Sequence, residues 1–531
     1  MTDPGRIPVV VGVSGHRALR PQDRETLLEA VKRELTNLQA QVPHSPLLLL
    51  TSLAEGADLL CADAARELGV SVAVALPMEA EAYTAAFSPE DRRRFEAHCR
   101  SAQTVFVVPP SEEAPETPDS SWLYRQAGIY ISLHSHLLLA LWDGGPAKEQ
   151  GCGTAEAVSF SLGGAYRPRR GMPLRSAENT AVLHIWAPRA SGGGRAGETR
   201  LLGNEEAFLE TLRKTDELNR LAPETEPQGG LLPEGPEGDS LLAGLEAVYH
   251  VSDALSLRCA KKYRRILGLL AAASTAVTAG FLLYDEAGLS WMLLLCGAML
   301  LFALFCRRWA VRSDCHRGYI EYRVLAESLR TQAFLRYAGS EQEAPELFPR
   351  TQREECPWVL AALCALTVGP PPAQQRDIRV CWAEGQRDYH EQAEKRTHRA
   401  MLRSDLVVRA ALCASVALYV LALLFEAFFG GLFLPPAAAP SLIELWRTLL
   451  KVALGLLSAA TIFIANYYGK QSLSRVISDH GKMKRFYAEV AGQLERFGQS
   501  EELLRTLAAE ELVENGNWCS YQRDNTPDIS L

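Results

Sequence analysis

Residues 7–17 read IPVVVGVSGHR, an apolar run that ends in glycine, serine, histidine and arginine. A short run of this kind is typical of a buried strand, and Gly15 allows a tight turn directly after it. Similar apolar runs recur along the first 190 residues, at Leu47–Leu50, Val70–Leu76, Thr104–Val108, Leu137–Leu141 and Val182–Trp186. Helical patterns at Leu27–Leu38 and Ala54–Leu68 separate the first three. This alternation predicts a Rossmann-like α/β domain whose parallel strands carry ligand loops at their carboxyl ends.

The strongest ligand signal is Gly151-x-Gly153-Thr154-x-Glu156, which follows the strand expected at Leu137–Leu141. Glycines allow close backbone approach to an anion, and the amides and dipole of a helix N-terminus favour phosphate. The alternative is a set of purely structural turns. Together with the loops after the other strands, the predicted ligand-binding residues are Gly12, Ser14, Gly15, His16, Arg17, Ser52, Glu55, Gly56, Asp143, Gly144, Gly151, Gly153, Thr154 and Glu156.

Individual side chains in these loops have two interpretations each. Arg17 could form a forked bond to phosphate, or be an ordinary surface arginine. Glu55 could hold a ribose hydroxyl, whereas Asp58 is better placed to cap a helix. Trp142 could stack on a base, although a core or lid position is the commoner role for such a residue.

The second half of the chain contains four long apolar stretches. They lie at Ile266–Tyr284, Leu289–Cys306, Leu406–Phe429 and Val452–Tyr468. A bilayer requires about 20 apolar residues in helical form, so we expect four membrane spans in two hairpins. The alternative is four buried helices of a soluble protein. A fifth apolar stretch, Val359–Val368, is too short to span and is expected to be buried or interfacial.

Basic residues flank these stretches on one side. They lie before the first and third spans and after the second and fourth, at Lys261, Lys262, Arg264, Arg265, Arg307, Arg308, Arg312, Lys395, Arg396, Arg399, Arg403, Lys470 and Arg475. The positive-inside rule then places both termini of this multi-pass membrane protein in the cytoplasm. Arg447 and Lys451 are exceptions and would have to snorkel outward.

Composition excludes several classes of protein. The net charge is −8 without a long basic run, which argues against nucleic acid as a partner. The twelve cysteines are scattered with no C-x-x-C spacing, so we expect no zinc site, no other metal and no disulfide framework. We also expect no cofactor. The N-terminus lacks the pattern of a signal peptide.

We expect the chain to be organised in five parts. They are a ligand sensor at 1–222, a Pro/Gly/Glu-rich linker at 223–240, a first membrane hairpin with a coupling helix at 241–338, a cytoplasmic helical segment at 339–403, and a second hairpin with a long helix and polar tail at 404–531.

Three charged residues suit the coupling helix. Arg323, Glu327 and Arg330 have i,i+4 and i,i+3 spacing, so they lie on one helix face and could hold a second helix in register. The alternative is a solvated ion-paired face. Within the spans, Glu426, Thr278 and Asn466 are candidate pore residues, although small polar residues equally suit tight helix packing, and Glu426 lies close enough to a span end to snorkel.

Short motifs in both halves resemble known families. Gly12–Arg17, Thr51–Asp58 and Leu139–Glu156 resemble the SLOG superfamily, which includes LOG phosphoribohydrolases, DprA proteins and the sensor region of TRPM-type channels. Tyr322–Arg330, Trp382–His390 and Glu514–Trp518 resemble a SLATT membrane domain. Cys152 departs from the commoner glycine of the SLOG loop.

The resemblance implies a bacterial anti-phage defence protein. Its SLOG part would sense a nucleotide-derived signal, and its SLATT part would form a homo-oligomeric pore in the lipid bilayer. An alternative is a membrane-tethered nucleotide phosphoribohydrolase that uses Glu156 and Arg17, but Ala157 occupies the place of the family's final catalytic glutamate. A third hypothesis is a ligand-responsive membrane scaffold.

Overall fold

The computed structural model describes most of the chain, namely residues 5–147, 153–164, 166–169, 181–189, 194–224, 230–233, 238–428, 440–470 and 473–524. The chain divides into two compact units. The first, the sheet unit, contains Met1–Leu255, Glu321–Ile378 and Gln499–Tyr521; the second, the hairpin unit, contains Ser256–Ile320, Arg379–Gly498 and Gln522–Leu531.

The sheet unit contains a seven-stranded sheet in the order β4-β3-β2-β1-β5-β6-β7. The strands are β1 (Val9–Gly15), β2 (Leu47–Thr51), β3 (Ser71–Leu76), β4 (Thr104–Val107), β5 (Leu137–Trp142), β6 (Ala181–Trp186) and β7 (Thr199–Gly203). All neighbours pair in parallel except β6 and β7, which are antiparallel. The α/β prediction is therefore confirmed, while the edge strand β7, which lacks a long apolar run, was not foreseen.

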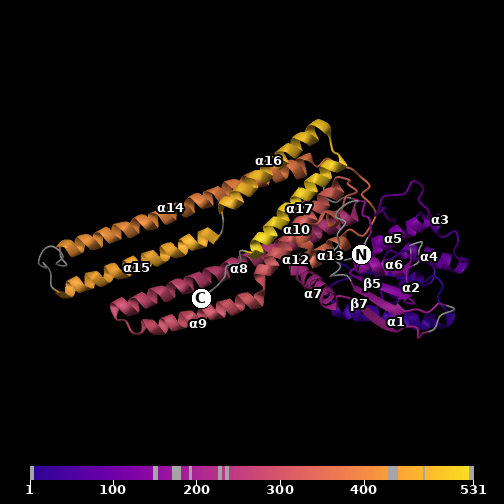
Figure 1. Ribbon diagram of the computed structural model, residues 1–531, viewed down its shortest axis with the longest axis horizontal. Helices are drawn as coiled ribbons and strands as arrows, with labels where there is room; N and C mark the ends of the chain where they lie inside the picture. The colour runs from indigo at the N-terminus through magenta and orange to yellow at the C-terminus, as the bar shows by residue number, and fades with distance from the viewer. Residues whose placement is uncertain are drawn as a thin grey trace. The chain divides into compact units, whose positions relative to one another are not determined.

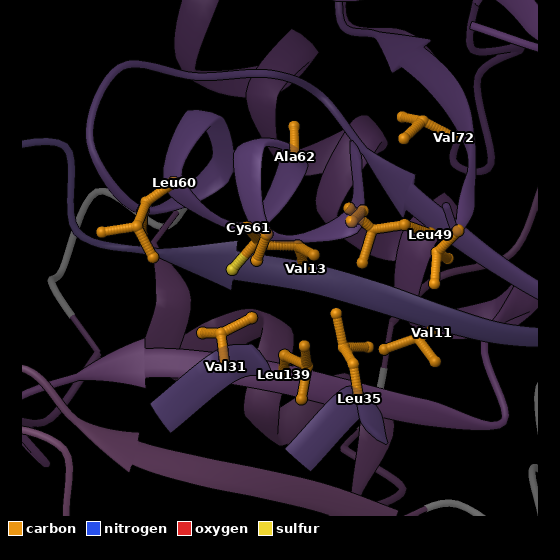
Figure 2. Close-up of a cluster of buried hydrophobic side chains, with 14 of the residues drawn as sticks. Val11, Val13, Val31, Leu35, Leu49, Leu60, Cys61, Ala62, Val72 and Leu139 are labelled. Carbon is orange, nitrogen blue, oxygen red and sulfur yellow. The ribbon is translucent and has the colours of Figure 1, made fainter. Parts of the chain in front are cut away.

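Helices cover the sheet because its strands are apolar on both faces. They are α1 (Arg24–Gln41), α2 (Ala57–Glu67), α3 (Ala80–Tyr83), α4 (Pro89–Ser101), α5 (Ser120–His134), α6 (Thr154–Ser161) and α7 (Glu205–Leu221). Val9, Val10 and Val11 of β1 are all fully buried, as expected for a parallel strand covered on both sides. Figure 2 shows members of the main cluster, among them Val11, Leu35 and Leu60 from β1, α1 and α2.

The rest of the described chain is mainly helical (Figure 1). The helices are α8 (Ser240–Ala287), α9 (Met292–Ser313), α10 (Cys315–Tyr337), α11 (Ala344–Leu347), α12 (Arg350–Glu355), α13 (Pro357–Leu366), α14 (Gly385–Phe428), α15 (Pro440–Lys470), α16 (Leu473–Phe497) and α17 (Glu501–Asp524), with a π-helical turn at Arg379–Glu384 before α14. Asp314 has a left-handed backbone (φ 41°), which ends α9 and begins α10. Both α8 and α10 contribute residues to both compact units.

Three helical segments of the described chain are long and apolar enough to cross a membrane, not four. They are Ser240–Glu286, Met292–Tyr337 and Arg379–Phe428, which contain the first three predicted spans. The fourth prediction, Val452–Tyr468, falls in α15, where most of the side chains from 459 onward lie outside the described residues.

Apolar packing and ion pairs stabilise the hairpin unit. Ile266 and Leu270 of α8 pack with Ala303 and Cys306 of α9. The two basic exceptions to the orientation rule have carboxylate partners: Arg447 Nε lies 2.5 Å from Glu426 Oε1, and Lys451 Nζ lies 3.0 Å from Glu286 Oε2.

Two segments differ from the sequence expectations. The polar tail is in fact helix α17, which buries Leu504, Leu507 and Leu512 on one face. The third span and the charged helix before it form a single helix, α14, because no proline or glycine interrupts the chain between Gly385 and Phe428.

The short apolar stretch forms α13, with Val359 and Leu363 fully buried, so the prediction of a non-spanning segment is confirmed.

Candidate functional site

The strand order makes the carboxyl ends of β1 and β5 the place where a ligand crevice is expected. The chain order runs outward from β1 in both directions, so the adjacent β1 and β5 form the point where the connections diverge. Open parallel sheets bind ligands at such a point. The loops that begin at Ser14 and at Asp143 lie there, since Ser14 pairs with Ala140 and Gly15 with Leu141 in the sheet.

His16 and Asp143 join these two loops. His16 Nε2 lies 3.1 Å from both the amide nitrogen and the carboxylate Oδ1 of Asp143. Arg189, which follows β6, places its Nε 2.7 Å from Asp143 Oδ2. Although burial opposes ionisation, the Gly145 amide, His16 and Arg189 together lower the pKa of Asp143. The Asp143 carboxylate is therefore charged. It contacts His16 in the loop after β1 and Arg189 after β6.

Arg17 supplies a cation beside this group. Its guanidinium lies over the Tyr124 ring, 4.6 Å from the ring centroid. Burial opposes the charge, but a hydrogen bond with Tyr124 prevails and raises the pKa of Arg17. The guanidinium of Arg17 is thus protonated and packs on an aromatic ring. Its paired N–H donors suit recognition of a phosphate or carboxylate.

The β1 and β2 loops touch backbone to backbone. Ala57 N donates to His16 O at 3.1 Å, and a Cβ added to Gly56 would lie 2.1 Å from Arg17 O. A side chain at Gly15 would likewise meet Ala57 Cβ at 2.3 Å. These glycines therefore permit close approach between loops, in addition to any role with a ligand.

The β2 loop contains a strained residue. Leu53 has φ 53° although it is a bulky residue, and such a backbone costs on the order of 1–3 kcal/mol. Thr51 Oγ1 accepts from Leu53 N at 3.0 Å and donates to Asp58 Oδ2 at 3.1 Å. Burial raises the pKa of Asp58 to about 6. Its carboxyl group stabilises the conformation of the β2 loop because it accepts from Thr51.

Other predicted residues of these loops make structural contacts. Ser52 Oγ donates to Ala75 O at 2.7 Å, and Glu55 Oε1 accepts from Ser88 N at 2.8 Å. Gly12 lies within β1, where a Cβ would meet Ser135 Oγ at 2.3 Å. Its missing side chain makes room for the end of α5.

The start of α6 leaves space next to its N-cap glycine. Gly153 is the N-cap residue, and a Cβ there would meet no heavy atom within 4 Å. Thr154 is buried, and Glu156 forms an ion pair with Arg125, which also binds Glu112 Oε2 at 2.8 Å. Gly151 lies outside the described residues. Open space beside Gly153 at the N-terminus of α6 is suitable for an anion.

Two tryptophans border the β5 loop. Trp142 Nε1 donates to Gly145 O at 2.9 Å, and the ring lies 5.0 Å from that of His184. Gly144 has φ 73°, and a Cβ there would meet the Trp186 ring at 3.1 Å. Sequence reasoning missed Trp186, Arg189, Tyr124 and Arg125, since none lies in a glycine-rich loop. Position after a strand was the available signal for the first two.

The charged residues of α10 form a buried cluster. Arg323 and Arg330 both pair with Glu327, the second at 2.5 Å, and Arg330 also pairs with Glu511 of α17. Arg323 Nη1 reaches Asp253 Oδ1 of α8 at 3.1 Å. Glu327 and Glu511 are buried, so this is not the solvated face of the alternative interpretation. We refer to Asp253, Arg323, Glu327, Arg330 and Glu511 as the ion-pair cluster.

The candidate pore residues are distributed in the hairpin unit. Glu426 pairs with Arg447, and Thr278 Oγ1 donates to Ser274 O at 3.1 Å. The side chain of Asn466 lies outside the described residues. In the described part of the chain, no three His, Cys, Asp or Glu side chains gather closely enough to hold a metal ion.

Comparison with known proteins adds no family to this geometry. No protein-family model matches the chain, and a search of curated proteins found no match. What stands is an N-terminal parallel α/β domain followed by long helices, three of which are apolar enough to span a membrane.

Proposed function

We propose that this chain is a ligand-gated membrane effector. The crevice at β1 and β5 binds a nucleotide-derived signal, and binding opens an oligomeric pore in the bacterial inner membrane as an abortive defence against phage. The chain crosses the membrane four times with both termini in the cytoplasm, and α15 provides the fourth span.

The ion-pair cluster carries this proposal. It belongs to the same compact unit as the crevice, and its residues lie on α8, α10 and α17, three helices that continue into the hairpin unit. Removing one partner of a buried ion pair costs about 3–5 kcal/mol. Shifting an equilibrium from 1:99 to 99:1 requires about 5.5 kcal/mol. Unpairing one of these buried carboxylates is therefore of the same order as the free energy that a switch requires.

Binding at the crevice rests on two features that suit a phosphate-bearing ligand. Arg17 is a supported cation, and Gly153 leaves open space before the amides of α6. One four-span subunit encloses too little space for a wet pore, so several copies would surround an axis.

Leakage from liposomes tests the proposal. Purified protein is reconstituted with an entrapped dye, and a panel of mono- and dinucleotides is added. We expect at least one nucleotide to trigger release. Gly153→Asp should abolish binding and release, because it places a carboxylate in the anion position. Gly153→Ala is the matched control, since the added methyl meets open space.

The coupling variant separates binding from output. Glu327→Arg places like charges beside Arg323 and Arg330, so ligand affinity should persist while release is lost. If a nucleotide binds the wild-type protein but causes no leakage, the hypothesis that remains is a ligand-responsive membrane scaffold. Steady release of a free base, abolished by Glu156→Gln, would instead favour the phosphoribohydrolase.

A further inference from the structure

The sheet unit contains a cavity of about 140 Å³ between α5 and the segment that links the second and third candidate spans. Its walls come from the residues after β4, from the end of α5 and from α11, α12 and α13. The described residues that line it include none of those at the β1 and β5 crevice. It is therefore a second, separate hollow in the same unit.

Flat and apolar groups form much of the wall. The rings of Tyr130 and His134 stack with centroids 3.9 Å apart. Tyr130 is held in place because its hydroxyl accepts from Gly369 N at 3.2 Å. The lining also contains five prolines: Pro109, Pro110, Pro168, Pro345 and Pro357. Rigid rings of this kind favour a flat, compact occupant over a flexible chain.

The charged groups of the wall are mainly acidic. Glu341, Glu343 and Glu346 line the cavity, together with Arg353. Arg353 donates to backbone carbonyls, at 2.8 Å to Phe348 O and at 3.0 Å to Pro345 O. These bonds fix its guanidinium against the α11 backbone. The cavity therefore offers carboxylate acceptors and disfavours an anionic ligand.

One wall residue offers a donor. His136 is 2% exposed, and its Nδ1 accepts from Val10 N at 3.1 Å. Burial lowers the pKa of His136 to about 4, so the ring is neutral and its proton lies on Nε2. Nε2 is buried and has no hydrogen-bond partner within the described part of the chain. An unpaired buried donor is costly, and a ligand acceptor would remove that cost.

We infer that this cavity binds a flat nitrogen heterocycle that carries N–H donors and no phosphate, such as an aminated nucleobase. The volume fits a single ring system, since an engineered cavity of about 150 Å³ holds benzene. The stacked Tyr130 and His134 rings form an aromatic wall, and the carboxylates accept from the amino group.

Calorimetry on the full chain in detergent tests this inference, with adenine as the probe. Adenine should bind, and purine, which lacks the amino group, should bind about tenfold more weakly, since a hydrogen bond to a charged group has about that value. Ala361→Phe fills the cavity and should weaken adenine binding more than tenfold. Ala373→Phe is the matched control at an exposed position and should have no effect.

A second variant guards against misfolding of the first. Glu341→Gln removes a charge at the largely exposed rim, and we expect about threefold to tenfold weaker adenine binding with unchanged thermal unfolding. The inference is overturned if adenine fails to bind wild type, or if neither variant changes its affinity. AMP binding that is unaffected by Ala361→Phe would belong to the crevice and would leave the cavity assignment intact.

Discussion

The sheet domain and the membrane hairpins are both built from runs of leucine, valine and alanine, but they place these side chains in opposite environments. Leu49 of β2 is fully buried, whereas Leu294 and Leu301 of α9 are 79% and 70% exposed. The most apolar window of the third span has none of its residues buried. Apolar composition therefore stabilises the first region through packing, whereas in the second it lies exposed on helices long enough to cross a membrane.

The charged pairs of the two regions also differ in their exposure to solvent. Glu511 in the ion-pair cluster is 2% exposed, whereas Arg447 and Glu426 at the end of the hairpin are both substantially exposed. The following substitutions test this contrast.

Removing a cation from each pair should give the largest difference. Arg330→Met leaves Glu511 buried without its partner, and we expect a loss of about 4 kcal/mol in unfolding free energy. Arg447→Met should cost about 1 kcal/mol or less, since exposed pairs contribute little. Denaturant unfolding of the full chain in detergent gives both values, and equal losses would contradict the contrast.

Truncation of one leucine in each region comes next. Leu49→Ala creates a cavity in the core and should cost about 3 kcal/mol. Leu294→Ala removes a side chain that faces outward and should leave unfolding in detergent within about 0.5 kcal/mol of wild type. A similar loss for both would mean that α9 packs against protein at Leu294.

Alanine at two left-handed glycines separates strain from crowding. Gly56 (φ 85°) and Gly288 (φ 64°) both have backbones that disfavour a side chain, but only at Gly56 would the Cβ meet another backbone atom. We expect Gly56→Ala to cost about 2–3 kcal/mol and Gly288→Ala about 1 kcal/mol. Thermal unfolding measures both, and a larger effect at Gly288 would refute this assignment.

The smallest expected effect concerns pH. Burial, with Glu327 and Glu511 nearby, raises the pKa of Glu514 to about 7. A carboxyl with a raised pKa in the folded state contributes stability that is fully present below about pH 4.5 and is lost as pH rises through 7. Glu514→Gln should remove this loss and stabilise the protein by on the order of 1–2 kcal/mol at pH 8 relative to pH 5. An unchanged pH profile would place the titration elsewhere.

Much of the sheet domain could be predicted because its signals are local. The apolar runs at β1, β2 and β5 require burial on both faces, and that requirement alone places them in a parallel sheet. The residues of the crevice follow, since loops at the carboxyl ends of parallel strands meet at one edge. β7 escaped prediction because an edge strand with polar residues such as Thr199 and Arg200 has no such run.

The partners of charged groups could not be predicted in this way. The spacing of Arg323, Glu327 and Arg330 predicts a common helix face, and this was confirmed, but Asp253 and Glu511 lie 70 and 181 residues from their partners. The Arg189–Asp143 pair, the Tyr124 support for Arg17 and the Arg125–Glu156 pair likewise join separate elements.

The sequence by itself determined the α/β class, the apolar helices and the edge of the sheet where a ligand would bind, because periodicity and composition act over a few residues. Only the tertiary structure decided which carboxylates are paired, which glycines separate crowded backbones, that the tail packs as α17, and that α5 and α11–α13 enclose a cavity. Those features depend on contacts between segments far apart in the chain, and no local pattern encodes which segments will meet.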